Sequence, residues 1–158
     1  MKVLLVYDEQ LQLIRLESAV KKALPPETET LCYSNPVKAL EENAETKFDV
    51  AFLDIEMPKI NGIQLAKKLK AVNPAVNIIF VTAYNDYALD AYKMHASGYI
   101  TKPVNENKVK EEMEGLRHPV ELKRANRLYV KCFGNFEVFS DGVPLKFQRS
   151  KSKNKCYY

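Results

Sequence analysis

The stretch Asp49-Val-Ala-Phe-Leu-Asp-Ile-Glu-Met-Pro-Lys-Ile-Asn-Gly62 decides the fold of this chain. Its first part is an apolar run, which is typical of a strand buried on both faces in a parallel sheet covered by helices. The run ends at Asp54, and Gly62 begins a segment in which Leu65, Ala66, Leu69 and Val72 have helical spacing. The stretch therefore predicts a strand and a helix with an acid at the carboxyl end of the strand.

Outward from this stretch, strand-like runs alternate with segments of helical periodicity over the first 118 residues. The expected strands cover residues 2–7, 28–33, 48–53, 76–81 and 98–101, and the expected helices cover 11–24, 35–44, 62–72, 86–94 and 105–116. Such alternation predicts the α/β class, with a doubly wound five-stranded parallel sheet. A short antiparallel β segment is expected from residue 128, with a turn at Asp141-Gly142.

Composition and charge exclude several classes of protein. Hydrophobic residues make up 46% of the 158 residues and charged residues 28%, as in ordinary globular proteins. The longest apolar run, residues 3–7, is far shorter than the ~20 residues of a membrane-spanning helix, so we expect a cytoplasmic protein without membrane contact. Residues 1–118 hold 15 Lys and Arg against 17 Asp and Glu, net −2, whereas residues 119–158 hold 9 against 3, net +6. The basic segment is either a solvated tail or part of a surface that meets an acidic partner such as nucleic acid.

Reactive side chains stand at the ends of four expected strands. Asp8-Glu9 follows the first strand, Asp54 the third, Thr82 the fourth and Lys102 the fifth. The carboxyl ends of parallel strands share one edge of the sheet, where open α/β sheets bind ligands. This set suits phosphoryl transfer to a carboxylate, with Asp54 as the nucleophile and Mg²⁺ held by acids. Thr82 and Lys102 would bind the phosphoryl oxygens.

These motifs resemble the receiver domain of bacterial two-component response regulators. The resemblance covers about residues 1–117 and is carried by Val3-Leu-Leu-Val-Tyr-Asp-Glu9, Asp49–Gly62, Ile79-Phe-Val-Thr-Ala83 and Gly98-Tyr-Ile-Thr-Lys-Pro103. It implies a flavodoxin-like fold with strand order 2-1-3-4-5. It also implies a sensor histidine kinase or a phosphotransfer protein as phosphate donor, and a homodimer through the helix at 86–94, the strand at 98–101 and the helix at 105–116.

The resemblance also assigns roles to individual residues. Asp54 is the phosphorylated residue, and Lys102 contacts the phosphoryl group and precedes a cis peptide bond to Pro103. The metal ligands are Asp8, Asp54 and the main-chain carbonyl of Glu56, with Glu9 as a further acid at the Mg²⁺ site. Thr82 and Tyr99 are the switch pair. No nucleotide or other organic cofactor is implied, since no Gly-rich phosphate loop occurs.

One residue departs from the family pattern. Receivers usually have two acids after the first strand, and here the first of these places is held by Tyr7, while Asp8 holds the second. We expect Mg²⁺ binding to survive in weaker form. A bulky phenol beside the pocket would also slow phosphorylation or dephosphorylation.

The C-terminal segment has a second resemblance. Residues 128–153, which begin Leu128-Tyr-Val-Lys-Cys-Phe-Gly-Asn-Phe-Glu-Val-Phe, are similar to the opening of SARP-type winged-helix activators. We therefore expect a receiver at 1–117, a linker at 118–127 and the truncated start of an output domain at 128–158. DNA would be bound only through the missing part of that domain, because no recognition helix is present.

The sequence as a whole predicts a signalling switch that takes phosphate on Asp54 and controls transcription. It would be no enzyme beyond an autophosphatase activity. Two alternatives remain open. One is a small phosphohydrolase with an aspartyl nucleophile, in which Glu56 would be the general acid or base. The other is a pseudo-receiver that acts as an interaction module without phosphorylation.

Overall fold

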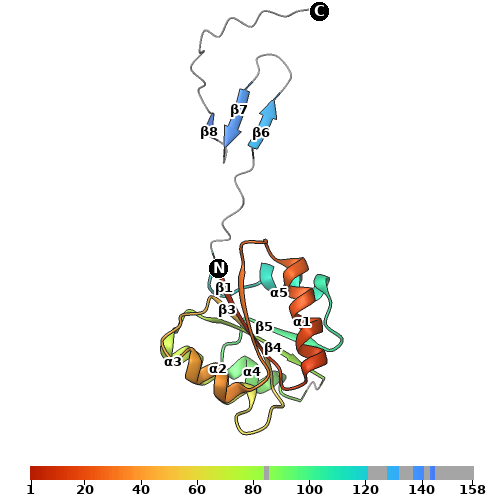
Figure 1. Ribbon diagram of the computed structural model, residues 1–158, viewed down its shortest axis with the longest axis vertical. Coiled ribbons are helices and arrows are strands. Elements are labelled where there is room, and N and C mark those ends of the chain that lie inside the picture. Colours follow the sequence, from red (N-terminus) through yellow and green to blue (C-terminus); the bar gives the residue numbers. More distant parts are fainter. Residues whose placement is uncertain (84–85, 121–127, 132–136, 141–142, 145–158) are drawn as a thin grey trace, which may run out of the picture. The chain divides into compact units, whose positions relative to one another are not determined.

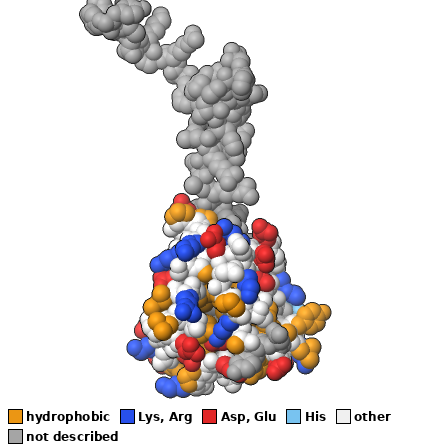
Figure 2. Space-filling view, turned by 90° about the vertical axis from the view of Figure 1, so that its right-hand side faces the viewer, with side chains coloured by type: hydrophobic (Ala, Val, Ile, Leu, Met, Phe, Trp, Pro, Cys, Tyr) orange, Lys and Arg blue, Asp and Glu red, His pale blue; other side chains and the backbone are white. Residues whose placement is uncertain are grey.

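The computed structural model of the chain describes residues 1–83, 86–120, 128–131, 137–140 and 143–144 (Figure 1). The chain divides into two compact units, Met1–Leu122 and Lys123–Tyr158. No helix in these described ranges is long and apolar enough to cross a membrane. Figure 2 shows one face of the first unit, on which basic, acidic and hydrophobic side chains intermix.

The first unit is a doubly wound α/β fold, as the sequence predicts. Its parallel sheet has the order β2-β1-β3-β4-β5. The strands are β1 (Lys2–Val6), β2 (Glu29–Tyr33), β3 (Val50–Asp54), β4 (Asn77–Thr82) and β5 (Gly98–Thr101). The helices are α1 (Gln10–Ala23), α2 (Pro36–Glu42), α3 (Gly62–Val72), α4 (Ala88–Lys93) and α5 (Glu106–Glu114). These bounds differ from the predicted ones by up to two residues at most ends, the usual uncertainty of element termini.

Helices cover both faces of the sheet (Figure 1). One apolar core joins the sheet to α2, α3 and α4, and a second joins it to α1 and α5. All residues of the central strands β3 and β4 are buried. A strand that is buried on both faces needs apolar side chains along its middle, which explains the apolar runs in the sequence; the buried polar residues of β3 and β4 stand at the strand ends.

Asparagine side chains fix the starts of three helices. Asn35 Oδ1 accepts from the N–H of Val37 at the start of α2, directly before the expected Pro36. Asn61 forms a capping box with Gln64 at the start of α3, and Asn105 accepts from Lys108 at the start of α5. Such caps satisfy backbone donors that the first turn leaves without partners. They set where each loop at the carboxyl edge of the sheet ends.

The second unit contains three short strands. β6 (Leu128–Lys131), β7 (Glu137–Ser140) and β8 (Val143–Pro144) pair antiparallel in this order. The antiparallel β segment is therefore confirmed. The predicted turn at Asp141-Gly142 and most of the predicted linker lie outside the described residues.

Gly62 lets the loop between β3 and α3 close onto the end of β3. Its N–H donates to the Ile55 oxygen at 2.9 Å. A Cβ at this position would stand 2.1 Å from the main-chain oxygen of Asp54, so no larger residue fits without a backbone shift. The glycine thus fixes the backbone around Asp54.

Gly62→Ala is expected to lower the free energy of unfolding by about 1–3 kcal/mol, because the added methyl group forces the Asp54 backbone to move. Urea denaturation measures the change. Gly115→Ala is the matched control, since a Cβ there meets nothing nearer than 3.9 Å. Equal stability of the two variants would contradict the close approach at Gly62.

Candidate functional site

The predicted residues meet at the carboxyl edge of the sheet. Asp54 ends β3 with 3% of its surface exposed, and Thr82 ends β4 with 1% exposed. Lys102 directly follows β5, and its Nζ lies 3.3 Å from Asp54 Oδ2. The N–H of Glu56 points to Asp54 Oδ1 at 3.4 Å. The structure thus joins a buried carboxylate and an ammonium group that are 48 residues apart in the chain.

The environment of Asp54 works against its charged form. Burial, and to a lesser extent the Asp8 and Glu56 carboxylates, raise the pKa of Asp54 from 3.8 to about 7. The backbone N–H groups of Glu56 and Ile55 act in the opposite direction. The Lys102 ammonium also favours the charged form, as any cation at this distance does. Burial itself lowers the pKa of Lys102.

The oxygen donors fit a hard divalent cation. Asp8 follows β1 and Asp54 ends the neighbouring strand β3, and the Asp8 charge contributes to raising the pKa of Asp54. Mg²⁺ is held in proteins by one or two carboxylates together with other oxygens, and its charge would relieve this repulsion. Across the described ranges, no three His, Cys, Asp or Glu side chains gather into a metal cluster. The side-chain donors are therefore few, and Glu9 is exposed at the start of α1.

Tyr7 takes part in the site through its ring. The side chain is 1% exposed, and the Lys102 Nζ stands 4.4 Å from the centre of its ring. An ammonium over an aromatic face is attracted by the ring quadrupole. The Tyr7 hydroxyl is buried, and no hydrogen-bond partner for it occurs among the described residues. Lys102 is thus held between the Asp54 carboxylate and a π face.

A second contact that sequence reasoning missed joins two loops of the site. The Tyr87 hydroxyl, directly before α4, donates to Glu56 Oε1 at 3.2 Å. Glu56 lies in the loop after β3, and no spacing in the sequence relates it to Tyr87, 31 residues away. This hydrogen bond joins the loop after β4 to the loop that follows Asp54.

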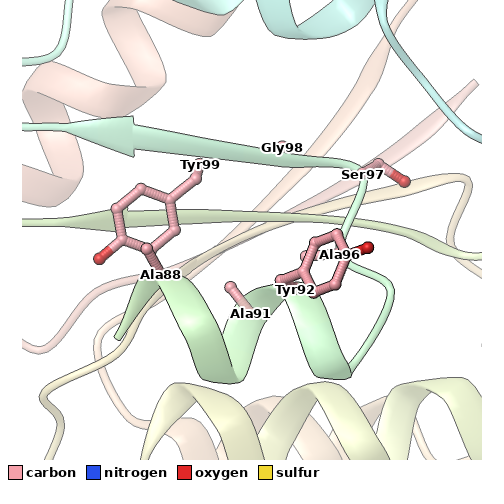
Figure 3. A pocket seen from close by; sticks show the side chains of 7 residues that line it. All are labelled: Ala88, Ala91, Tyr92, Ala96, Ser97, Gly98 and Tyr99. Carbon is pink, nitrogen blue, oxygen red and sulfur yellow. The ribbon is translucent and has the colours of Figure 1, made fainter. Parts of the chain in front are cut away.

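The predicted switch residues lie on one face of the sheet. In the register of β4 and β5, Tyr99 pairs with Phe80 and Thr101 with Thr82, so Thr82 and Tyr99 are diagonal neighbours on the same face. Tyr99 lines a cavity of about 260 Å³ between α4 and β5, and Tyr92 stands at the other end of that cavity (Figure 3). Thr82, at the end of β4, and Tyr99, in the cavity between α4 and β5, therefore lie on the same face of the sheet.

With this geometry in place, comparison with known proteins identifies the family. The sequence model of the response regulator receiver domain matches residues 3–114. The chain belongs to the response regulator receiver family. Receiver domains are phosphorylation-controlled signalling switches of two-component systems and bind Mg²⁺, and this chain contains one.

Relatives and solved structures agree with this assignment. LytT of Enterococcus faecalis is 37% identical over 114 residues, which cover 72% of this chain and 47% of LytT. BtsR of Escherichia coli is 33% identical over 146 residues, which cover 87% of this chain and 60% of BtsR. The regulatory domain of mrkE from Klebsiella pneumoniae matches with a TM-score of 0.66 and 28% identity, covering 73% of this chain and 94% of that domain. TrrA of Thermotoga maritima, solved in complex with Mg(2+)-BeF, matches with a TM-score of 0.62 and 28% identity. This match covers 72% of this chain and 96% of the TrrA chain.

The comparisons correct the prediction that the C-terminal segment begins a SARP-type domain. This chain spans about half the length of LytT and 60% of BtsR. Its relatives include LytT and BtsR regulators, and the SARP-type assignment of residues 128–153 is not supported. Two or three short strands with a turn signal begin many kinds of β domain. Such a pattern therefore cannot distinguish one class of output domain from another.

Asp54→Asn is expected to raise the free energy of unfolding at pH 7 by about 1–2 kcal/mol, because it removes a buried charge that Asp8 repels. Since the folded pKa of about 7 lies above the ordinary 3.8, the wild type loses stability as pH rises between these values. The gain in the free energy of unfolding of Asp54→Asn over the wild type should therefore be small near pH 4 and largest at pH 7 and above. Thermal unfolding at several pH values without Mg²⁺ measures it. Glu41→Gln, at an exposed carboxylate on α2, should change stability by less than about 0.5 kcal/mol.

Tyr7→Asp is expected to strengthen Mg²⁺ binding by about tenfold, because it adds a third carboxylate beside Asp8 and Asp54. Tyr7→Asn is the matched control, since it removes the same ring and adds no charge. Titration with Mg²⁺, followed by NMR, gives both affinities. If the two variants bound Mg²⁺ equally, Tyr7 would not stand at a metal-binding place.

Proposed function

We propose that Asp54 accepts the phosphoryl group by which this receiver is switched. The observation that carries the proposal is the Asp54 carboxylate, buried at the end of β3 with the Lys102 ammonium 3.3 Å away. A carboxylate inside an apolar sheet is costly, so it is expected where it serves chemistry. Asp8 and Asp54, with the main-chain carbonyl of Glu56, would hold Mg²⁺, and Glu9 would add negative charge nearby. The cation supplies charge neutralisation for the transferring group.

The donor would be a phosphohistidine on a sensor kinase or a phosphotransfer protein. An Asp54 carboxylate oxygen attacks phosphorus and forms a P–O bond, while the P–N bond breaks and its electron pair remains on the imidazole. Lys102 would bind phosphoryl oxygens through its ammonium group and keep them oriented. Tyr7 would keep Lys102 in place during this step, because an aromatic face neither takes the proton nor competes for the phosphoryl group.

The response would pass through Thr82 and Tyr99. A phosphoryl group on Asp54 adds about −1.5 to −2 charges and new acceptor oxygens, which draw the Thr82 hydroxyl toward it. Tyr99, diagonal to Thr82 on the same face of the sheet, would then change its position beside α4. We propose that the surface of α4, β5 and α5 carries this change to a second copy of the chain.

The output would be transcriptional. BtsR is named a transcriptional regulatory protein, and its match to this chain covers 87% of the residues, more than the receiver match at 3–114. We propose that residues 1–117 form the receiver, that 118–127 link it, and that 128–158 belong to an output region like that of LytT and BtsR. DNA binding would be a property of the whole regulator.

Incubation with acetyl phosphate and Mg²⁺ is expected to add one phosphoryl mass to the wild type and none to Asp54→Ala. Intact-protein mass spectrometry measures this. Asp90→Ala, at an exposed carboxylate on α4, is the matched control and should be modified like the wild type. A phosphoryl mass on Asp54→Ala would contradict the assignment. In a separate assay, many turnovers of a small phosphate ester per protein would favour a phosphohydrolase.

A further inference from the structure

A second cluster of charged side chains lies at the opposite edge of the sheet from Asp54. A cavity of about 490 Å³ opens there between the ends of α3, α4 and α5. Asn77 and Gly98, which begin β4 and β5, mark this as the amino edge of the sheet. The cavity is lined by Lys70, Pro74, His95, Arg117 and His118. It is therefore separate from the pocket around Asp54, Thr82 and Lys102.

The lining of this cavity has one sign of charge. Lys70 and Arg117 carry full positive charges, the two imidazoles are further N–H donors, and no carboxylate lines the space. In the described ranges, neither Lys70 nor Arg117 forms an ion pair with an acid. Burial, and secondarily the Arg117 charge, lower the pKa of Lys70. Two cations that repel each other beside a cavity without acids favour an anion as the occupant.

The cationic groups are held in place by the backbone. Lys70 Nζ donates to the main-chain oxygens of Met94 and His95 at 2.9 and 3.0 Å. Arg117 Nε donates to the Ala96 oxygen at 3.1 Å. An ammonium group has three donors, and a guanidinium group has four N–H donors besides that on Nε. Both side chains thus keep donors for a ligand while their positions are set.

Asparagine side chains fix the backbone walls of the cavity. Asn77 is fully buried, donates to the His118 oxygen at 2.8 Å and accepts from the His118 N–H at 3.0 Å. On the other wall, Asn73 accepts from Ala75 at 3.1 Å and donates to the Phe48 oxygen at 2.9 Å, which holds the turn around Pro74. A site whose groups are fixed before binding loses less entropy when the ligand arrives.

We propose that this cavity binds a small anion that carries two or more phosphate groups. The volume lies within the range of about 300–1,000 Å³ that is usual for small-ligand pockets. Lys70 and Arg117 are bound to the main-chain oxygens of three successive residues, 94 to 96, so the two cations lie side by side. Two adjacent fixed cations match two anionic groups of one ligand better than a single phosphate. A guanidinium group binds phosphate oxygens in pairs, and imidazoles add donors to the remaining oxygens. The receiver would then take a soluble ligand at the edge of the sheet that phosphorylation does not use.

Tripolyphosphate is the probe, and the full chain is titrated with it at physiological ionic strength. Backbone amide NMR signals are followed with isotope-labelled protein. Saturable shifts are expected at residues 95–97 and 117–118. Shifts without saturation, or shifts centred on residues 119–158 or on the Asp54 pocket, would overturn the proposal.

Arg117→Gln and His118→Gln are each expected to weaken binding, the first by tenfold or more and the second by a smaller factor. His118 keeps its backbone bonds to Asn77 in this variant, so the fold is preserved. Lys68→Gln removes the same charge from an exposed place on α3, and Arg124→Gln removes one from the basic C-terminal segment. Both controls should bind as the wild type does, within about twofold. An equal loss of tripolyphosphate affinity in the controls and in Arg117→Gln would show that binding is general charge attraction, and it would refute a specific site in this cavity.

Discussion

The contact between the buried Asp54 carboxylate and the Lys102 ammonium is the constraint on which the carboxyl edge of the sheet depends. A carboxylate at the end of an apolar strand loses most of its hydration, and removing its partner would leave a buried charge uncompensated, at a cost of several kcal/mol. The loops at this edge are arranged accordingly. Gly62 allows the loop after β3 to close, and the Glu56 N–H points to the carboxylate. The fold therefore carries a stability cost at this site, because burial disfavours the charged form of Asp54.

Tyr7 changes the electrostatic balance of this contact. Where the family usually has a further acid, this chain has an aromatic face 4.4 Å from the Lys102 ammonium. A π face attracts an ammonium group without adding a formal negative charge. The pocket thus has one carboxylate fewer to hold a cation, while its lysine keeps a second partner. The same substitution leaves a buried hydroxyl without a partner in the described residues, which is a cost in stability.

The two edges of the sheet have different chemistry. The carboxyl edge brings together acids and one lysine, and the amino edge holds a cavity lined by basic side chains. β4 runs from the amino edge, at Asn77, to the carboxyl edge, at Thr82, and is buried along its whole length.

The sequence by itself determined the fold and the residues at the carboxyl edge. Apolar runs and helical spacing predicted the elements, and a parallel sheet places all strand ends on one edge, so Asp54 and Lys102 could be predicted to meet. Only the tertiary structure decided which side chains touch across the site. Tyr7 lies under Lys102, and Tyr87 reaches Glu56, because helix packing brings together residues with no fixed spacing. The basic cavity could not be predicted from the sequence for the same reason, since the side chains that line it come from three separate chain segments.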